Sequence, residues 1–463
     1  MNSFIEFSEK LTSLLSRLPK RQGQKLYFFL TDQANLQNLG LWISAVVAAL
    51  ISVGYAMLFR WLEGLGEKIY ALHSGYWAFL AAPAFFVLAW LVVRRFAPEA
   101  AGSGIPQIMA ANEIDHDGPH RPYLERLLSP RVLVTKVLSS LLCVAGGGAI
   151  GREGPTLQIS AGVFYLVGRQ IRKVAPGFRE QTWIVAGAAA GLASAFNTPL
   201  GGIVYAIEEL GVVQFHKIRT ALISAVIVSG LVAQWILGNY LYLGFPRLEV
   251  IGFSFLPWSL LVGAIAGYLG GSFGRILYIL AISRQRLGSQ RKLLLLSICC
   301  GLIMAMLYQL ERRAVGPGIE VITGLLFHDE TSSSTLAATR FLGTMVSYLS
   351  GAAGGIFSPS LATGGAIGAL LEDILRTGHP NLMVLLGMIG FLTGVTRTPF
   401  TAFILVLEMT DRHSAVFPMM MAALAAQSAA HFTDRKSFYE RMKERFLPSE
   451  TKTNGPRVAA RLD

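Results

Sequence analysis

The chain has 463 residues, of which 53% are hydrophobic and only 15% are charged. Soluble domains carry about 25% charged residues, so this composition excludes an ordinary soluble fold. The formal net charge of +12 would suggest nucleic-acid binding in a soluble protein, but here the basic residues lie between and beside long apolar runs, where they indicate membrane topology and lipid contact.

The predicted elements begin with residues 1–33, which are polar and amphipathic, show no signal-peptide pattern and are expected to form a cytoplasmic segment. Residues 39–59 and 76–93 are each apolar and long enough to cross a bilayer, which takes about 20 residues. Further apolar runs follow at 132–150, 182–207, 221–243, 253–282, 293–308, 335–350, 381–407 and 416–430. Basic residues precede the first run and follow the last, so both termini, including a tail at 447–463, are expected on the cytoplasmic side. The pattern predicts an all-α, multi-pass membrane protein.

Cysteines and histidines indicate little chemistry. Cys143, Cys299 and Cys300 lie inside apolar runs and are interpreted as packing residues rather than as a disulfide framework. His116 and His120 flank an Asp-Gly pair in a polar loop, where solvent contact is a better interpretation than a metal site. The chain contains no H-E-x-x-H motif, Walker loop or nucleophile elbow, so we expect neither an enzyme nor an ATP-driven pump, and no cofactor or metal.

The main internal feature is a repeat. A series of Gly, Leu and Thr-Pro positions at 187–199 runs on to Glu208. The same positions recur two hundred residues later, at 387–399, and run on to Glu408. Upstream of the two copies lies a second matching pair, in which each member has the form G-x-x-x-P, at 151–155 and 355–359.

Two matching pairs in the same order indicate a duplicated unit. We predict a first membrane repeat at 34–240 and a second at 241–446. Duplicated halves with helices that are interrupted by Gly and Pro are typical of transporters whose site lies between the halves. Interrupted helices must be buried in protein or line a wet cavity, because lipid satisfies no backbone hydrogen bonds.

Three glycine-proline segments interrupt the apolar pattern, at 102–106 (GSGIP), 151–155 (GREGP) and 354–359 (GGIFSP). In each, the proline stands where a helix can begin, because its fixed φ suits the first turn. A helix start offers unpaired N–H donors and about half a positive charge, which suits an anion. Three such starts that converge would hold a halide without a fixed Lys or Arg, from which the ion would leave slowly. Ser103 adds a hydroxyl donor to the first segment.

In this order, the segments resemble one family, the CLC chloride channels and proton-coupled chloride antiporters. The resemblance extends over about residues 38–445. It rests on GSGIP, GREGP and GIFSP, on AFNTPLGGIVYAIEE at 195–209, and on Lys436-x-x-Tyr439. It implies a CLC-type fold with two inverted repeats of tilted and broken helices, and a homodimer with one pore per subunit.

The resemblance also implies a set of site residues. Ser103 and Tyr439 would donate hydroxyl hydrogen bonds to a central chloride ion, and the backbone N–H groups of Ile356 and Phe357 would complete its shell. Supporting residues from the same motifs are Gly102, Gly104, Pro106, Arg152, Gly154, Pro155, Gly355 and Pro359. In this family a proline at position 103 goes with nitrate and a serine with chloride, and an intact GREGP argues against the fluoride-exporting branch.

Glu153 is the residue on which the functional interpretation depends most. A carboxylate inside an anion site competes with the anion for the same donors, so deprotonated Glu153 would block chloride and protonated Glu153 would release the path. This competition would link proton uptake to anion movement. The alternative is a structural ion pair with Arg152, but acids within membrane segments are functional by default.

Glu208 and Glu209 end a long apolar run, which a helix end at the membrane interface would also explain. The resemblance places Glu209 at the family's internal proton-relay position, where antiporters generally have an acid and many pure channels have an apolar residue. The chain is therefore predicted to exchange chloride for protons, with a passive voltage- or pH-gated chloride channel as the alternative. Glu408, the repeat-mate of Glu208, is structural or unassigned.

Two features of the sequence depart from what is common in the family. Gln107 follows GSGIP where bacterial relatives often have an acid, which puts the charge near the pore in doubt. The family's cytoplasmic nucleotide-sensing CBS domains are expected to be absent, and the compact length predicts a bacterial inner-membrane protein. The expected partners are chloride and other small anions, protons, membrane lipid and a second copy of the chain, but not nucleic acid.

Overall fold

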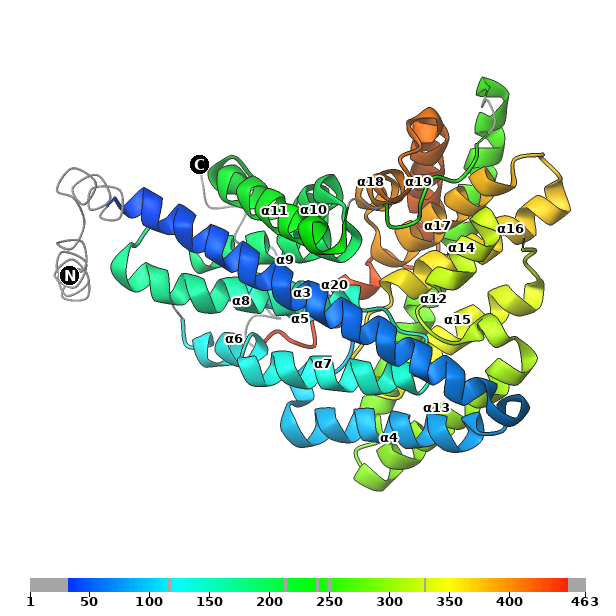
Figure 1. Ribbon diagram of the computed structural model, residues 1–463, viewed down its shortest axis with the longest axis horizontal. Coiled ribbons are helices and arrows are strands. Elements are labelled where there is room, and N and C mark those ends of the chain that lie inside the picture. The colour runs from blue at the N-terminus through cyan, green and yellow to red at the C-terminus, as the bar shows by residue number, and fades with distance from the viewer. Residues whose placement is uncertain are drawn as a thin grey trace.

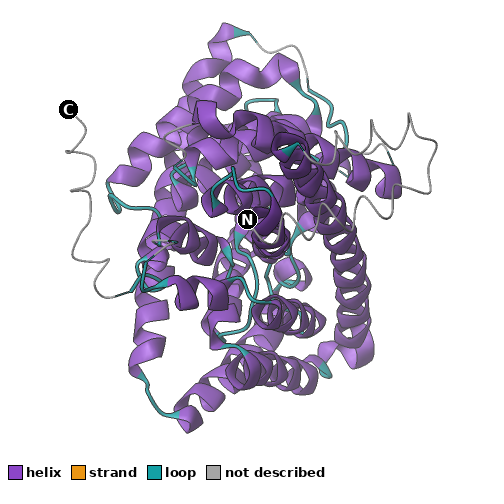
Figure 2. Ribbon diagram, turned by 90° about the vertical axis from the view of Figure 1, so that its left-hand side faces the viewer, coloured by secondary structure: helices purple, strands orange, loops and turns teal. Residues whose placement is uncertain are grey.

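The computed structural model describes residues 32–448, apart from 115, 117, 212–214, 239–240, 249–251 and 329. The regular structure in this part of the chain is helical, without β-strands (Figure 2). The sequence prediction of an all-α fold is therefore confirmed.

The first half of the chain lies mostly on the left of Figure 1 and contains the long helix α3, which crosses the front of the molecule. Its α-helices are α3 (Gln33–Ala71), α4 (Ala78–Phe96), α5 (Ile105–Glu113), α6 (Arg121–Leu127), α7 (Pro130–Ala145), α8 (Glu153–Val174), α9 (Glu180–Phe196), α10 (Pro199–Glu208) and α11 (Phe215–Leu237).

The second half lies mostly on the right of Figure 1. Its α-helices are α12 (Leu256–Arg286), α13 (Gln290–Leu310), α14 (Ile319–Phe327), α15 (Ser334–Leu349), α16 (Phe357–Leu375), α17 (Pro380–Thr396), α18 (Pro399–Thr410), α19 (Val416–His431) and α20 (Phe438–Lys443).

Among the described residues, six helical segments are long and apolar enough to cross a membrane. They are Gln33–Ala71, Ala78–Phe96, Arg121–Ala145, Ile218–Leu237, Leu256–Arg286 and Gln290–Leu310. Large apolar side chains remain exposed on these helices, as at Trp42, Leu80 and Leu231, which is the outward face that hydrocarbon requires. Cys299 also lies on an exposed face, so its interpretation as a packing residue is wrong, whereas Cys143 and Cys300 are buried as expected.

Two of the predicted apolar runs, 182–207 and 381–407, are each broken into two helices. In both, the first helix ends at a residue in the left-handed conformation, Asn197 (φ 55°) or Arg397 (φ 64°), and a Thr-Pro pair starts the second helix. Proline disfavours a helical conformation in the residue before it, so the chain turns at this point. The run at 182–207 therefore forms α9 and α10, and its repeat forms α17 and α18.

The interrupted helices lie inside the protein rather than against lipid. Every residue of 153–165 in α8, of 357–368 in α16 and of 382–396 in α17 is buried. Glycine makes this packing close: a Cβ at Gly364 of α16 would lie only 2.4 Å from the backbone oxygen of Gly387 on the neighbouring α17. The broken ends of these helices are therefore available to a site enclosed by protein.

Candidate anion and proton site

Two of the predicted glycine-proline segments, one from each half of the chain, are joined by their backbones. Gly151 and Gly355 exchange two N–H to C=O hydrogen bonds of 2.7 Å each in an antiparallel bridge. The N–H of Gly102 donates to Ala352 O and the N–H of Gly354 donates to Gly102 O, each over 3.1 Å, in a parallel bridge with Ala353. All three segments therefore meet at one place, between the two repeats.

Helices begin directly after these bridges. Helix α8 has Arg152 as its N-cap and α16 has Ile356, and neither helix start is capped by a side chain. Helix α5 follows Gly104, whose φ of 108° is a conformation that favours glycine. The prolines stand at the second or third helical residue, so the helices begin one or two residues earlier than the sequence interpretation placed them.

Gln107 caps the start of α5. Its side-chain oxygen accepts a hydrogen bond from the Gly104 N–H at 3.1 Å, and its side-chain nitrogen donates to Glu99 O at 3.0 Å and Ala101 O at 2.8 Å. An acid at this position would have no N–H groups for those two carbonyls. The residue that departs from the family pattern therefore holds the loop of Ser103 in shape with a neutral side chain.

Ser103 and Tyr439, which lie 336 residues apart in sequence, are brought together. Both are buried, with exposed fractions of 1% and 0%, and their side chains lie close to each other. Neither hydroxyl has a hydrogen-bond partner among the described residues. Gly154 packs directly on the serine, since a Cβ there would lie 2.4 Å from Ser103 Oγ. Two buried hydroxyl donors without acceptors fit a bound anion, which accepts hydrogen bonds only.

The predicted backbone donors lie at the start of α16. Ile356 is its N-cap and Phe357 its first residue, positions at which N–H groups have no partner within the helix. Both residues are buried, with exposed fractions of 0% and 1%. The structure thus supplies the donor types that the sequence predicted for a chloride shell, namely two hydroxyls and a helix start.

Glu153 lies at the first residue of α8 and is 1% exposed. Its Oε1 accepts a hydrogen bond of 2.7 Å from Ser358 Oγ, in the first turn of α16, while its Oε2 has no partner among the described residues. The carboxylate therefore lies beside the same helix start that carries the predicted anion donors. The sequence interpretation requires that Glu153 does not face lipid, and the buried position of its side chain meets this requirement.

The segment that carries Tyr439 is fixed at both of its ends. Arg397 donates to Ala430 O at 2.6 Å and to Asp434 O at 3.0 Å, and Asp434 pairs with Arg441 at 2.5 Å. Burial alone would raise the pKa of Asp434, but hydrogen bonds from Arg441 and from the Lys436 backbone outweigh it and hold that pKa below the ordinary value. These contacts lie at the ends of α17 and α19 and in the segment that follows, and they keep α20 against the site.

A cavity of about 330 Å³ opens beside Glu209, between α5, the end of α10, the α17–α18 junction and α20. Glu209 is 8% exposed, and its Oε2 has no partner among the described residues. The buried Tyr205 side chain lies near both Glu209 and Tyr439. A Lys443–Glu113 ion pair on the wall of this cavity joins α20 to the end of α5. The predicted proton-relay residue therefore borders a space wide enough for water, one tyrosine away from the anion site.

The model of the family described as voltage gated chloride channel matches residues 84–431. The chain belongs to this family. That match covers all three glycine-proline segments and the Thr-Pro repeats, and it confirms the family resemblance seen in the sequence.

Relatives within the voltage-gated chloride channel family are similar over most of their length. The chain is 30% identical over 464 residues to the H(+)/Cl(-) exchange transporter ClcA of Citrobacter koseri, covering 94% of this chain and 92% of the relative. It is also 30% identical over 389 residues to the exchanger of the same name from Vibrio vulnificus, covering 81% and 80%.

Solved structures show the same fold. A slow cyanobacterial Cl-/H+ antiporter superposes with a TM-score of 0.77 at 24% identity, over 90% of this chain and 99% of the other. A CLC-type fluoride/proton antiporter superposes with a TM-score of 0.72 at 21% identity, over 88% and 97%. The CLC-type fold predicted from the sequence is thereby confirmed.

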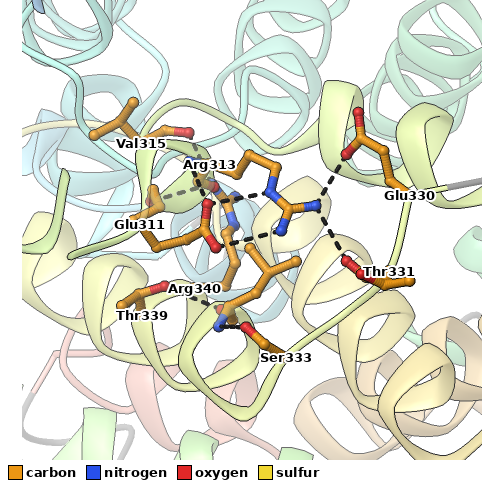
Figure 3. Close-up of polar contacts among 10 residues, drawn as sticks. Glu311, Arg313, Val315, Glu330, Thr331, Ser333, Thr339 and Arg340 are labelled. Atoms are coloured by element: carbon orange, nitrogen blue, oxygen red, sulfur yellow. Dashed lines mark hydrogen bonds and ion pairs between the residues drawn. The ribbon is translucent and has the colours of Figure 1, made fainter. Parts of the chain in front are cut away.

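A second cavity, of about 220 Å³, lies near the end of α3 and is lined by Glu63, Glu67, Arg312 and Arg313 among others. Arg313 pairs with Glu311 and Glu330, as Figure 3 shows. Behind this network, the fully buried Arg340 donates to four successive backbone carbonyls, from Arg313 to Gly316, at 2.8–3.4 Å. These contacts fix a loop in the second half of the chain beside helix α3 of the first half.

Sequence reasoning missed several residues of the site. Ser358 stands inside the quoted GIFSP motif, but nothing in the sequence shows that its hydroxyl reaches Glu153. Tyr205 lies within the quoted repeat and gives no signal apart from that position. His116 was interpreted as solvated, yet its ring lies 3.3 Å from the buried Glu180 carboxylate, which also pairs with Arg121 and Arg172.

Proposed function

We propose that this chain is a membrane exchanger that moves chloride in one direction and protons in the other. The observation that carries the proposal is the position of Glu153, a buried carboxylate that lies beside the helix start of Ile356 and Phe357 and accepts from Ser358. The relatives named as H(+)/Cl(-) exchange transporters, which align over most of the chain, support the same activity.

The anion path follows from the donors. Chloride and the deprotonated carboxylate of Glu153 both accept hydrogen bonds, so they compete for the donors at the start of α16. A protonated Glu153 is neutral and no longer holds those donors strongly, so chloride takes its place. Ser103 and Tyr439 donate to the ion without a fixed positive charge that would retain it.

The proton path begins at the other acid. Glu209 borders the cavity, from which water delivers a proton, and Tyr205 lies near both Glu209 and Tyr439 of the anion site. A proton that reaches Glu153 opens the anion path, and its departure to the opposite side closes it. Each proton is thereby linked to anion movement, which distinguishes an exchanger from a channel.

The cavity beside Glu209 is assigned to the cytoplasmic side. The connection between α8 and α9 lies on the same face, because Gln181 at the start of α9 donates to Asn112 O at the end of α5 at 3.2 Å. The end of α8 and the connection that follows it are rich in basic residues, namely Arg169, Arg172, Lys173 and Arg179. Excess Lys and Arg mark cytoplasmic loops. Since the curated relatives are bacterial, the inner membrane of a bacterium is the proposed location.

A second copy of the chain is the proposed partner of the face formed by α10 and α18. Large apolar side chains are exposed there, with Leu200 at 58% and Phe400 at 52%. The carboxylates of Glu208 and Glu408 lie on the same two helices and are only partly buried. Lipid penalises carboxylates at membrane depth, whereas a protein partner covers apolar and polar groups together.

The deciding experiment uses the purified chain in liposomes with a chloride gradient and no pH gradient. Chloride that leaves the vesicles down its gradient should drive protons into them. When a pH gradient that favours proton exit is then imposed, the chloride gradient should still drive protons inwards. Chloride movement without proton movement would instead identify a passive channel. Absence of chloride movement would contradict both functions.

A further inference from the structure

Glu208, at the end of α10, caps the start of α18. Its Oε1 accepts from the Phe400 N–H at 3.2 Å, and its Oε2 accepts from the Thr401 N–H at 2.7 Å and from Thr401 Oγ1 at 2.8 Å. The N-cap residue of α18, Thr398, makes no side-chain cap of its own. The positive end of α18 is therefore covered by a carboxylate from the other repeat.

Glu408, at the end of α18, caps the start of α10 in the same way. Its Oε1 accepts from the Leu200 N–H at 3.0 Å and its Oε2 from the Gly201 N–H at 2.6 Å. The N-cap residue of α10, Thr198, also makes no side-chain cap. The two helices are in contact, and they run antiparallel because the end of each meets the start of the other. Each supplies the cap that the other lacks.

The two caps lie in different surroundings. Glu208 borders the 330 Å³ cavity together with Glu209 and with the α17–α18 junction at 396–398. Glu408 is not among the residues that border this cavity. The same chemistry therefore occurs twice, once next to the proton-relay position and once at the opposite end of the helix pair.

The adjacent acids Glu208 and Glu209 differ in the number of hydrogen bonds that their carboxylates accept. Both oxygens of Glu208 accept hydrogen bonds from α18, three donors in all, whereas Glu209 Oε2 has no partner among the described residues. A protonated oxygen accepts hydrogen bonds more weakly than a charged one, so a proton on Glu208 would loosen its hold on α18. Both oxygens of Glu208 are thus engaged by the helix start, whereas Glu209 has an oxygen available for a proton.

We propose that Glu208 is a positioning residue for the proton step, which fixes the backbone of Glu209 by tying the last turn of α10 to the first turn of α18. Glu408 makes the equivalent cap without serving the proton step. This inference rests on the proposed exchange activity. Loss of the Glu208 cap frees the end of α10, so Glu209 leaves the cavity wall while the anion site, built from other segments, remains in place.

The experiment compares Glu208→Gln with the matched control Glu408→Gln in liposomes, with chloride flux and chloride-driven proton flux measured on the same vesicles. Glu208→Gln should lower the ratio of protons to chloride about fivefold, because it replaces one of the two acceptor oxygens at the start of α18 with an amide NH2 group, with chloride flux preserved. Glu408→Gln should leave the ratio unchanged. Both variants should lower the unfolding temperature in detergent, because a glutamine offers one acceptor oxygen where each carboxylate uses both of its oxygens.

Thr401→Val separates positioning from proton carrying. It removes one donor to Glu208 and keeps the carboxylate, so the proton-to-chloride ratio should fall by about twofold. A normal ratio in Thr401→Val together with a lost proton flux in Glu208→Gln would make Glu208 a carrier and overturn the proposal. An equal fall in Glu408→Gln would overturn it as well. A wild-type chain that moves chloride without protons would contradict the proposed exchange instead.

Discussion

The Ser358 hydroxyl donates a hydrogen bond of 2.7 Å to Glu153 Oε1, across the boundary between the two repeats. Ser358 belongs to the first turn of α16 and Glu153 to the first turn of α8. In the proposed exchange, this contact holds the carboxylate at the place where it would compete with the anion. The strength of the hydrogen bond would then set how readily the glutamate leaves.

Ser358→Ala removes that donor and should raise chloride flux at neutral pH by about tenfold or more, because a hydrogen bond to a charged group stabilises the blocking state by about 1.5–3 kcal/mol. Chloride efflux from liposomes measures the change. Ser360→Ala is the matched control, since its hydroxyl donates within α16 to Ile356 O and not to Glu153. A lower flux in Ser358→Ala than in Ser360→Ala would show that the serine serves the anion rather than the glutamate.

Glu153→Gln removes the charge that competes with chloride. Chloride flux should persist and lose its dependence on pH, whereas wild-type flux should rise as the pH falls, because protonation neutralises the carboxylate. Proton movement driven by chloride should disappear. Efflux recorded between pH 4.5 and 7.5 with a chloride electrode and a pH electrode tests both points. Proton movement that persists in this variant would exclude Glu153 as the link between the two ions.

Glu209→Gln should abolish proton movement and leave chloride movement within about twofold of the wild type, because the side chain borders the cavity but not the anion donors. A glutamine keeps the size of the side chain, so the cavity wall is retained. Proton and chloride fluxes measured together provide the test. Unchanged exchange would make Glu209 a structural residue at the end of α10.

Ser103→Pro should shift anion preference from chloride towards nitrate. The substitution removes the hydroxyl donor of a side chain that lies close to Tyr439 in the buried site, and the resemblance to the family associates proline here with nitrate. Ser103→Ala separates loss of the hydroxyl from the effect of the proline ring. Competition between labelled chloride and nitrate in liposome uptake measures the preference. The same selectivity in all three forms would remove Ser103 from the anion site.

Asp434→Asn should destabilise the chain at neutral pH, because it removes the acid that pairs with Arg441 and holds the Tyr439 segment. The pKa of Asp434 is lower in the folded chain than its ordinary value, so its contribution to stability is present above about pH 4 and lost as the pH falls through the folded pKa. Unfolding temperatures in detergent should thus differ at pH 7 and converge at acidic pH. A constant difference down to pH 3 would contradict the ionic role.

The sequence predicts this site as far as local backbone chemistry reaches. Glycine and proline restrict φ and hydrogen bonding within a few residues, so the helix starts at 105, 153 and 357 follow from GSGIP, GREGP and GIFSP to within two residues. The constant offset between the two repeats also predicts that Glu208 and Glu408 occupy equivalent positions. Ser103 and Tyr439 were paired only through the family resemblance, since composition and spacing do not bring residues 336 positions apart together.

What could not be predicted depends on side chains that meet across the repeats. The caps made by Glu208 and Glu408 join residues more than 190 positions apart, so Glu408 was left unassigned. Gln107 was seen as a departure in charge, but its three hydrogen bonds to a loop appear only when that loop has its final shape. His116 was misinterpreted for the same reason, because its partner Glu180 lies at the start of a different helix.

The backbone bridges from Gly102 to Ala353 and from Gly151 to Gly355 have a consequence for biogenesis. Each joins an unwound segment made early in translation to one made some two hundred residues later. Until the later half has been inserted, the unwound backbone of the earlier half lacks its hydrogen-bond partners, and lipid cannot supply others. Membrane insertion of the first half must therefore be followed by a waiting period, in which water or the insertion machinery shelters those peptide groups.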